Sequence, residues 1–208
     1  AMYSAYTDMY NSNNFDWICV IDCDEFITFT DEYKNIKDYL SEADNYTFNF
    51  INAIALNWMC YGDNDMLYKE NGNVVERFKS PLDINFKIDF WPFPHNCGVK
   101  SILKKLNKFT QLTHPHIFND FKYMNNDFSP ISNDLFINWQ IPYYNHNRAY
   151  IRHYCTKTID EFINQKIKRN EQPDNNELKL DIENYFYLFN KRTKEKDEIT
   201  IKNLKSII

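Results

Sequence analysis

Three acidic side chains within four positions, Asp22, Asp24 and Glu25, are the first residues of this sequence that point to chemistry. They directly follow an apolar run at residues 17–21. Two carboxylates separated by one residue offer oxygen ligands to a hard divalent cation, Mn²⁺ or Mg²⁺, which also holds phosphate groups. The spacing predicts a metal site with Asp22 and Asp24 as ligands, and an acidic surface turn is the alternative. Glu25 is expected to hydrogen-bond a neighbouring group or the backbone, or simply to cap the turn.

The apolar run predicts a β-strand that is buried on both faces, in a sheet covered by helices. Carboxylates at the C-terminal end of such a strand lie where α/β folds bind their ligands. Tyrosines at helical spacing predict a helix over residues 2–10, and a second helix is expected over 33–43. Further strand-like segments are found at 45–58, 97–103 and 149–155.

The later part of the chain is read as a loop followed by helices. Residues 125–140 are mostly polar and irregular, which predicts a surface loop. Thr158 and Glu161 have the spacing of a capping box at the start of a helix. We therefore expect an α/β fold, with a mixed sheet flanked by helices in residues 1–157. Residues 158–208 are expected to form a helical C-terminal extension packed on it.

The composition limits the classes of function. With 208 residues, 43% of them hydrophobic, the chain can form one well-packed domain. Three glycines and the lack of a Walker or Gly-x-Gly-x-x-Gly motif argue against a P-loop or Rossmann cofactor site. A net charge of −5 gives no reason to expect nucleic-acid binding. Five cysteines without a Cys-x-x-Cys pair, no signal peptide and no membrane-spanning run predict a cytoplasmic location.

The segments Asp16-Trp17-Ile18 and Asp22-Cys23-Asp24-Glu25-Phe26, with the apolar run between them, resemble the signature of GT-A glycosyltransferases of the family 2 and family 92 kind. In that family the Asp-x-Asp element binds a divalent cation and the diphosphate of a nucleotide sugar. The resemblance implies a GT-A-like sheet and metal-dependent transfer of a sugar, with inversion, from a nucleotide sugar (a UDP-sugar as first choice) to a glycan or lipid-linked acceptor.

The resemblance also bears on the extent and the setting of the chain. Only one helix is expected before the Asp-x-Asp element, whereas GT-A domains build their nucleotide pocket from earlier strand–helix units. The resemblance therefore covers the second half of such a domain, and we expect the chain to be a fragment. Capsule or lipopolysaccharide assembly in a bacterium is the expected setting, with peripheral contact at the inner membrane as an extension of the cytoplasmic location.

A second stretch, residues 56–63, resembles the Trp-x-x-Phe-Gly-Ser segment of the same family. It implies that Trp58 stacks on a sugar ring, although a core tryptophan fits the pattern equally well. Gly62 would allow the backbone to approach a ligand closely. Asp63 and Asp65 are the nearest carboxylates and are the candidates for the general base. A solvent-facing turn is the alternative for these two residues.

Two more positions follow the order of the family's motifs. Lys100, in Lys-Ser-Ile, is a candidate for contact with a phosphate, and an ordinary surface lysine is its alternative. His114, in His-Pro-His, stands where the family has a histidine before its variable loop, and a structural histidine is its alternative.

The last motif is His153-Tyr154-Cys155-Thr156-Lys157, which resembles the family's His-Tyr-x-x-Lys segment. The resemblance implies that His153 completes the metal shell, because imidazole nitrogen also suits Mn²⁺. Lys157, just ahead of the predicted helix start, would bind the diphosphate together with free backbone N–H groups. A buried strand histidine and a surface lysine are the alternatives.

Two other functions remain open from the sequence. One is a metal-dependent phosphohydrolase or nucleotidyltransferase that uses the same carboxylates without an acceptor sugar. The other is a carbohydrate-binding or scaffolding module that uses Trp58, Trp91 and other aromatic residues. Glycan binding by such a module would survive EDTA and the loss of Asp24.

Overall fold

The computed structural model describes residues 2–12, 14–46, 51–64, 66, 68–87, 91–112, 114, 116–158, 160–162 and 164. Within these residues the protein is a mixed α/β protein with a seven-strand mixed sheet and few helices. The α-helices and strands, in chain order, are α1 (Met2–Ser12), β1 (Trp17–Cys19), β2 (Glu25–Phe29), α2 (Ile36–Ala43), β3 (Ala53–Cys60), α3 (Val74–Arg77), β4 (Val99–Lys104), β5 (Tyr123–Asn125), β6 (Pro130–Ile131) and β7 (Ala149–His153). Short 3-10 helices lie at Asp44–Tyr46, His95–Cys97 and Asn133–Leu135.

The chain separates into two compact units. The first consists of Ala1–Met59 and Ile84–His153, and the second of Cys60–Asp83 and Tyr154–Ile208. Residues 165–208, most of the predicted helical extension, lie outside the described residues. No helix in the described part of the chain is both long and apolar enough to cross a bilayer.

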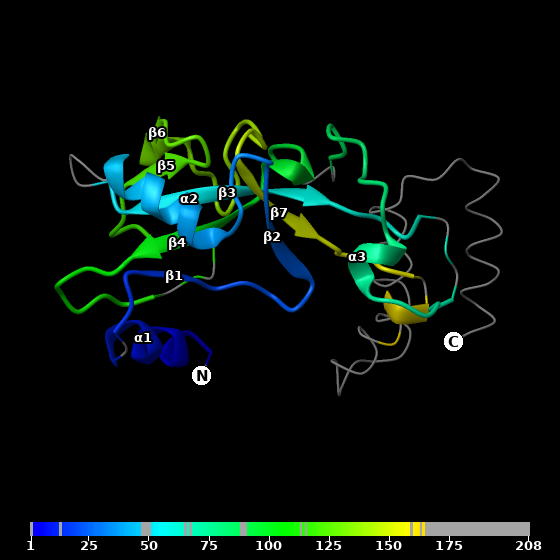
Figure 1. The fold of residues 1–208 in the computed structure, drawn as a ribbon, viewed down its shortest axis with the longest axis horizontal. Coiled ribbons are helices and arrows are strands. Elements are labelled where there is room, and N and C mark those ends of the chain that lie inside the picture. The colour runs from blue at the N-terminus through cyan, green and yellow to red at the C-terminus, as the bar shows by residue number, and fades with distance from the viewer. Residues whose placement is uncertain are drawn as a thin grey trace. The chain divides into compact units, whose positions relative to one another are not determined.

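The sheet is centred on β3, whose residues are almost all buried. Its strand order is β1-β4-β3-β5-β6, and β7 pairs with both β3 and β2. The pairing of β4 with β1 and with β3 is antiparallel, whereas β3 and β5 are parallel. Figure 1 shows β3 running along the sheet with β4 and β7 nearby. This mixed sheet confirms the predicted strands near 97–103 and 149–155.

The strand before the acidic residues differs from the prediction. β1 covers only Trp17–Cys19, its residues are half-buried, and β4 is its one partner among the described strands. A strand buried on both faces was therefore the wrong expectation. Beyond the strand the chain turns at the acidic residues, where Glu25 N–H donates to the carbonyl of Asp22 at 3.1 Å.

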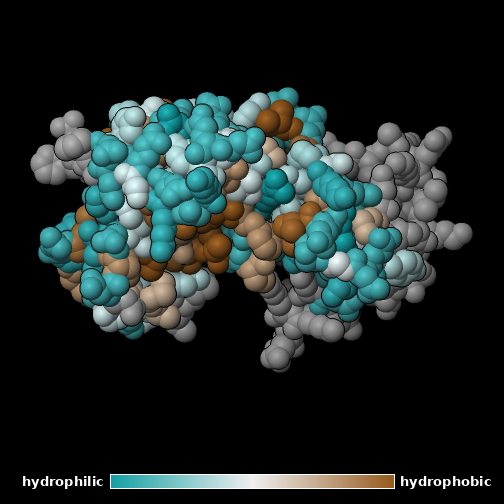
Figure 2. All heavy atoms as spheres, in the orientation of Figure 1, coloured by the Kyte–Doolittle hydropathy of each residue, from teal (hydrophilic) through white to brown (hydrophobic). Residues whose placement is uncertain are grey.

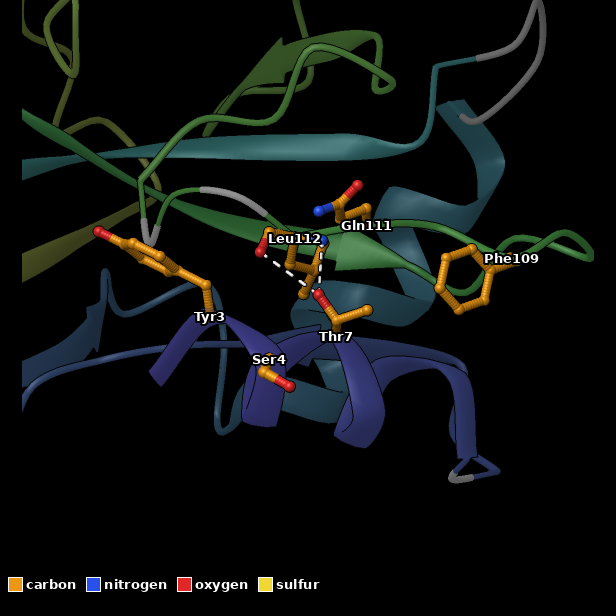
Figure 3. A pocket seen from close by; sticks show the side chains of 6 residues that line it. All are labelled: Tyr3, Ser4, Thr7, Phe109, Gln111 and Leu112. Carbon is orange, nitrogen blue, oxygen red and sulfur yellow. Dashed lines mark hydrogen bonds between the residues drawn. The ribbon is translucent and has the colours of Figure 1, made fainter. Parts of the chain in front are cut away.

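Helix α1 packs on the segment that follows β4. The hydroxyl of Thr7 bonds both backbone groups of Leu112, and Tyr10 Oη donates to the carbonyl of Lys104 at 2.9 Å. A cavity of about 480 Å³ lies between this helix and the segment. Figure 3 shows the side chains that line it: Tyr3, Ser4, Thr7, Phe109, Gln111 and Leu112. The predicted helix over residues 2–10 is confirmed and continues to Ser12.

Helix α2 begins at Ile36, three residues later than predicted, because Asn35 caps it by accepting bonds from the N–H groups of residues 37 and 38. Its buried Tyr39 donates a hydrogen bond to the carbonyl of Asn126 at 2.8 Å. The Tyr39 ring also contacts Phe29 of β2 and Phe128. Figure 2 shows a largely hydrophilic surface over α2, with hydrophobic side chains reaching the surface below it in that view.

The polar stretch at residues 125–140 is not the surface loop that was predicted. It contains the end of β5, all of β6 and a 3-10 helix. Asn125 and Asn126 are buried there. Their amide side chains bond Ser129 and the carbonyl of Asn145. Polar composition misled the prediction because these asparagines are internal hydrogen-bonding groups.

The second unit is described by its own contacts. The rings of Tyr61 and Tyr154 stack with centroids 4.8 Å apart. Arg77 of α3 makes two hydrogen bonds of 2.7 Å to the carboxylate of Glu161. Thr158 accepts from the N–H of Glu161, whose carboxylate bonds back to Thr158, so the predicted capping box is confirmed.

Candidate functional site

The acidic turn between β1 and β2 directs its two outer carboxylates differently. The side chain of Asp22 is 66% exposed, whereas that of Glu25 is 1% exposed. Glu25 Oε2 accepts a hydrogen bond from the backbone N–H of Asp22 at 2.9 Å, which is one of the two contacts that the sequence predicted for Glu25. Asp24, between them, is half-buried. The turn therefore offers one carboxylate to solvent and holds another inside.

Lys100 of β4 lies beneath this turn. Cys19 pairs with Ile102, and continuing this antiparallel register by two residues brings Lys100 level with Ile21, next to Asp22. Its Nζ is 2.9 Å from Asp22 Oδ2 and 3.3 Å from Glu25 Oε2, and its side chain is 1% exposed. The surface-lysine alternative is therefore wrong. This burial favours Lys100 as the internal counter-charge of two carboxylates over the predicted contact with a phosphate.

The three charged groups shift one another's pKa. Burial raises the pKa of Glu25 to about 7, against the opposing effect of the Lys100 ammonium. For Asp22, partial burial is outweighed by the hydrogen bond and charge of Lys100, so its pKa falls below the ordinary value. Burial likewise opposes the charge of Lys100, yet the two carboxylates raise its pKa. Near neutral pH, Asp22 and Lys100 are charged and Glu25 is about half protonated.

Histidines lie close to the same carboxylates. His153 of β7 is the direct cross-strand partner of Glu25, and electrostatic interaction with His153 and His116 contributes to the lowered pKa of Asp22. Burial and the charge of Lys100 lower the pKa of His116 to about 4. Its Nδ1 is 2.8 Å from the carbonyl of Val99, so Nδ1 carries the proton and Nε2 is left as an acceptor.

His114 belongs to the same group of histidines. Its ring centroid is 5.0 Å from that of His116. Burial and the charge of Lys100 lower the pKa of His114 below its ordinary value. At neutral pH both histidines are therefore uncharged, and they can accept or donate hydrogen bonds without adding positive charge.

Tryptophan rings pack next to these histidines. Trp58 is 5% exposed, and its ring centroid is 4.4 Å from that of His153 and 4.9 Å from that of Trp139. A Cβ on Gly98 would lie only 2.4 Å from Trp58 Cε3 and 2.5 Å from Trp139 Cζ3. This burial favours the packing alternative for Trp58, while its predicted stacking on a sugar stays a prediction. Partly exposed Trp91 stacks on His95, with centroids 4.3 Å apart.

His95 and Trp139 are parts of this cluster that the sequence reasoning missed. His95 follows an aromatic, proline-containing segment, and that composition was the only sequence signal that pointed there. Trp139 lies inside the stretch that was read as a polar surface loop. Both are recognised only once the sheet brings them to Trp58.

The three residues predicted to bind Mn²⁺ or Mg²⁺ do not fit a coordination shell as they are arranged. In the part of the chain that the structure describes, Asp22, Asp24 and His153 do not form a group whose donor atoms all lie within 4.8 Å of one another. The ammonium of Lys100 also holds one oxygen of Asp22. Metal binding therefore remains a prediction from the sequence.

The remaining predicted residues belong to the second unit or are not described. Asp63 is 4% exposed and Lys157 is 9% exposed, so the solvent-facing alternatives for these two are wrong. Gly62 is also buried, and Lys157 adopts a left-handed backbone with φ of 57°. Asp65 lies outside the described residues. Their predicted roles, as general base and in substrate binding, stay predictions.

The first unit thus brings together predicted residues from five separate parts of the sequence: Asp22 and Glu25, Trp58, Lys100, His114, and His153. The arrangement can hold a hydroxyl group at an exposed carboxylate and change its own charge near neutral pH. No family model, curated protein or solved structure matches this chain.

Proposed function

We propose that this chain is part of a glycosyltransferase with a GT-A-like sheet, which moves a sugar from a nucleotide sugar to a glycan or lipid-linked acceptor. The observation that carries the proposal is the meeting of the acidic turn, Lys100 and His153 in one unit. These residues come from three of the motifs that resemble the family, and nothing in their sequence positions requires them to meet. Their meeting supports a common site.

The chemistry proposed for the site begins with Asp22. Its exposed carboxylate is held in place by Lys100, and it can accept a hydrogen bond from a sugar hydroxyl group. Holding the reacting hydroxyl group in place lowers the activation barrier, because the entropy cost of positioning it is met on binding and not in the transition state.

Glu25 is proposed to change the net charge around the Asp22 carboxylate as the pH changes. With a pKa of about 7, it changes the net charge of the three-residue group from zero to −1 as the pH rises through neutrality. Its second oxygen, Oε1, is buried and has no hydrogen-bond partner among the described residues, which adds to the cost of the charged form. The proposed binding of substrate by Asp22 should therefore depend on pH near 7.

Two rivals make different predictions for the same protein. A phosphohydrolase or nucleotidyltransferase would turn over a phosphate ester without an acceptor sugar. A carbohydrate-binding module would bind glycans through its aromatic side chains and release no nucleotide. The partly exposed rings of Trp91 and Trp139 are the observation that favours a carbohydrate-binding module.

The test is release of nucleoside diphosphate from a panel of UDP- and GDP-sugars, with mixed bacterial oligosaccharides as acceptors and with Mn²⁺ or EDTA added. Asp22→Asn removes the exposed charge, and Asp31→Asn is the control because Asp31 is an exposed aspartate just beyond β2. Acceptor-dependent release that is lost in Asp22→Asn and kept in Asp31→Asn supports the proposal. Release that needs no acceptor favours the phosphohydrolase, and release that is equal in both variants contradicts the role of Asp22.

A further inference from the structure

A second cavity in the first unit, of about 440 Å³, lies at the segment that leads into β7. It is lined by Ile84, Tyr143, Tyr144, Asn145, His146 and Asn147. None of the residues that carried the resemblance belongs to it. Five consecutive lining residues, 143–147, form one loop, so the shape of the cavity depends on how that loop is held.

Two fully buried asparagines hold the loop in place by hydrogen bonds to its backbone. Asn57 of β3 donates to the carbonyl of Tyr143 at 3.3 Å and accepts from the N–H of Asn145 at 2.9 Å. Asn126 donates to the carbonyl of Asn145 at 2.6 Å and accepts from the N–H of Arg148 at 3.0 Å. Burying amide side chains is unfavourable unless they are bonded. Here three of the four bonds go to the loop and the fourth to Arg148, the residue that follows it.

The side chains of the loop add further bonds. Asn145 Nδ2 donates to Asp127 Oδ2 at 2.7 Å, and Asn145 Oδ1 accepts from the N–H of Asn147 at 3.0 Å. His146 Nε2 is 2.8 Å from the carbonyl of Trp58, which can only accept, so His146 carries its proton on Nε2. A loop fixed in this way loses little freedom when a ligand binds, which favours a preformed binding surface.

The surface of the cavity is aromatic and polar but not charged. Tyr144, which is 37% exposed, stacks with His146, with ring centroids 5.6 Å apart and planes at 28°. Burial lowers the pKa of His146, so its ring is neutral at pH 7. Asn147, which is exposed, lines the same cavity. Neutral rings with an adjacent amide match a ligand that has an apolar ring face and hydroxyl groups at its edge, and they offer no cation to a phosphate.

We propose that this cavity binds one sugar residue of a glycan, with a pyranose face on Tyr144 and a hydroxyl group bonded to the side chain of Asn147. The cavity adjoins the candidate site through Trp58, whose carbonyl bonds His146 and whose ring packs on His153. The proposal goes beyond the proposed function, because the cavity would bind a saccharide whether or not the chain transfers one.

The test is saturation-transfer difference NMR on the whole chain in EDTA and without nucleotide. The probes are the methyl glycosides of glucose, galactose, mannose and N-acetylglucosamine, with maltotriose and cellotriose. We expect at least one probe to bind, and Tyr144→Ala to weaken that binding by about tenfold because it removes the ring face. Tyr3→Ala is the matched control, since Tyr3 is a similarly exposed tyrosine (42%) that lines the other cavity.

A second readout does not depend on a folded variant. In the wild-type protein, the binding probe should shift the side-chain amide resonances of Asn147 more than those of Asn52. Failure of every probe to bind would overturn the proposal, as would equal binding by Tyr144→Ala and wild type or an unshifted Asn147. Because no nucleotide is present, these outcomes are independent of any result on nucleotide-sugar turnover.

Discussion

Glu25 of β2 and His153 of β7 are direct partners in an antiparallel pairing, so their side chains leave the same face of the sheet. This register joins the first and the last of the motifs that suggested a function. It also places His153 within electrostatic reach of Asp22, the exposed member of the acidic turn. The candidate site is therefore built by strand register, and its internal charge balance can be tested residue by residue.

Replacing Lys100 with Met should destabilise the protein strongly. The change keeps an apolar chain of similar length but leaves the buried Glu25 and its neighbour Asp22 without their counter-charge. Removing one partner of a buried ion pair costs about 3–5 kcal/mol of unfolding free energy. Urea unfolding at pH 7 measures this directly.

The control for this change is Lys104→Met in the same strand. Lys104 bonds Asp44 at 2.7 Å, but both side chains are partly exposed, and such a pair contributes about 0–1 kcal/mol. Equal losses in the two variants would mean that Lys100 is not an essential counter-charge.

The pH dependence of stability should report the pKa of Glu25. Its folded pKa of about 7 lies above its ordinary value of 4.5, so the folded state favours the protonated form. This contribution is complete below pH 4.5 and is lost as the pH rises through 7. Relative to Glu25→Gln, the wild-type unfolding free energy should fall by about 3 kcal/mol over that interval. A constant difference between the two proteins from pH 4.5 to 8 would contradict the raised pKa.

Gly98→Ala should disturb the tryptophan cluster. The backbone of Gly98 is extended, with φ of −64° and ψ of 148°, so an alanine is not strained there. Its Cβ would nevertheless collide with the rings of Trp58 and Trp139. We expect a loss of about 1–3 kcal/mol in unfolding free energy, together with a changed near-ultraviolet circular dichroism spectrum. An unchanged spectrum and stability would show that the rings are not packed against Gly98.

Asn57→Ala should loosen the loop that forms the second cavity. The change leaves the carbonyl of Tyr143 and the N–H of Asn145 without their buried partner, at a cost of about 2–3 kcal/mol. Hydrogen exchange at the amide of Asn145 should become faster. Asn52→Ala, which removes an exposed bond to Lys122, is the control and should cost less than about 1 kcal/mol. Unchanged hydrogen exchange at the amide of Asn145 would contradict the role of Asn57 in holding the loop.

Local pattern predicted several elements well. The helix at α1, the strands near β4 and β7, and the capping box at Thr158 were readable because periodicity and capping chemistry are local properties. The stretch 125–140 was misread because buried asparagines look like surface residues in a sequence. Only the tertiary structure shows that Asn126 bonds the backbone of Asn145 and Arg148. Asn125 bonds the hydroxyl groups of Ser129 and Tyr143.

The candidate site was predicted by residue type but not by geometry. Asp22, Glu25 and His153 were singled out as ligands or as their neighbours, yet the ion pair to Lys100 depends on the β1–β4 register. A lysine in a strand gives no sign of whether it points to solvent or beneath a carboxylate. The same limit applies to His146, whose place in the second cavity depends on its bond to the carbonyl of Trp58.

The most direct measurement is calorimetric titration of a UDP-sugar into the protein in the presence of Mn²⁺. Wild type is compared with Asp22→Ala and with the exposed control Asp31→Ala. We predict binding by wild type and by Asp31→Ala, and binding that is weaker by about tenfold or more in Asp22→Ala, because a hydrogen bond to a charged carboxylate is lost. Binding of equal strength in all three proteins, or no binding of the nucleotide sugar by wild type, would contradict the proposed binding of substrate by Asp22.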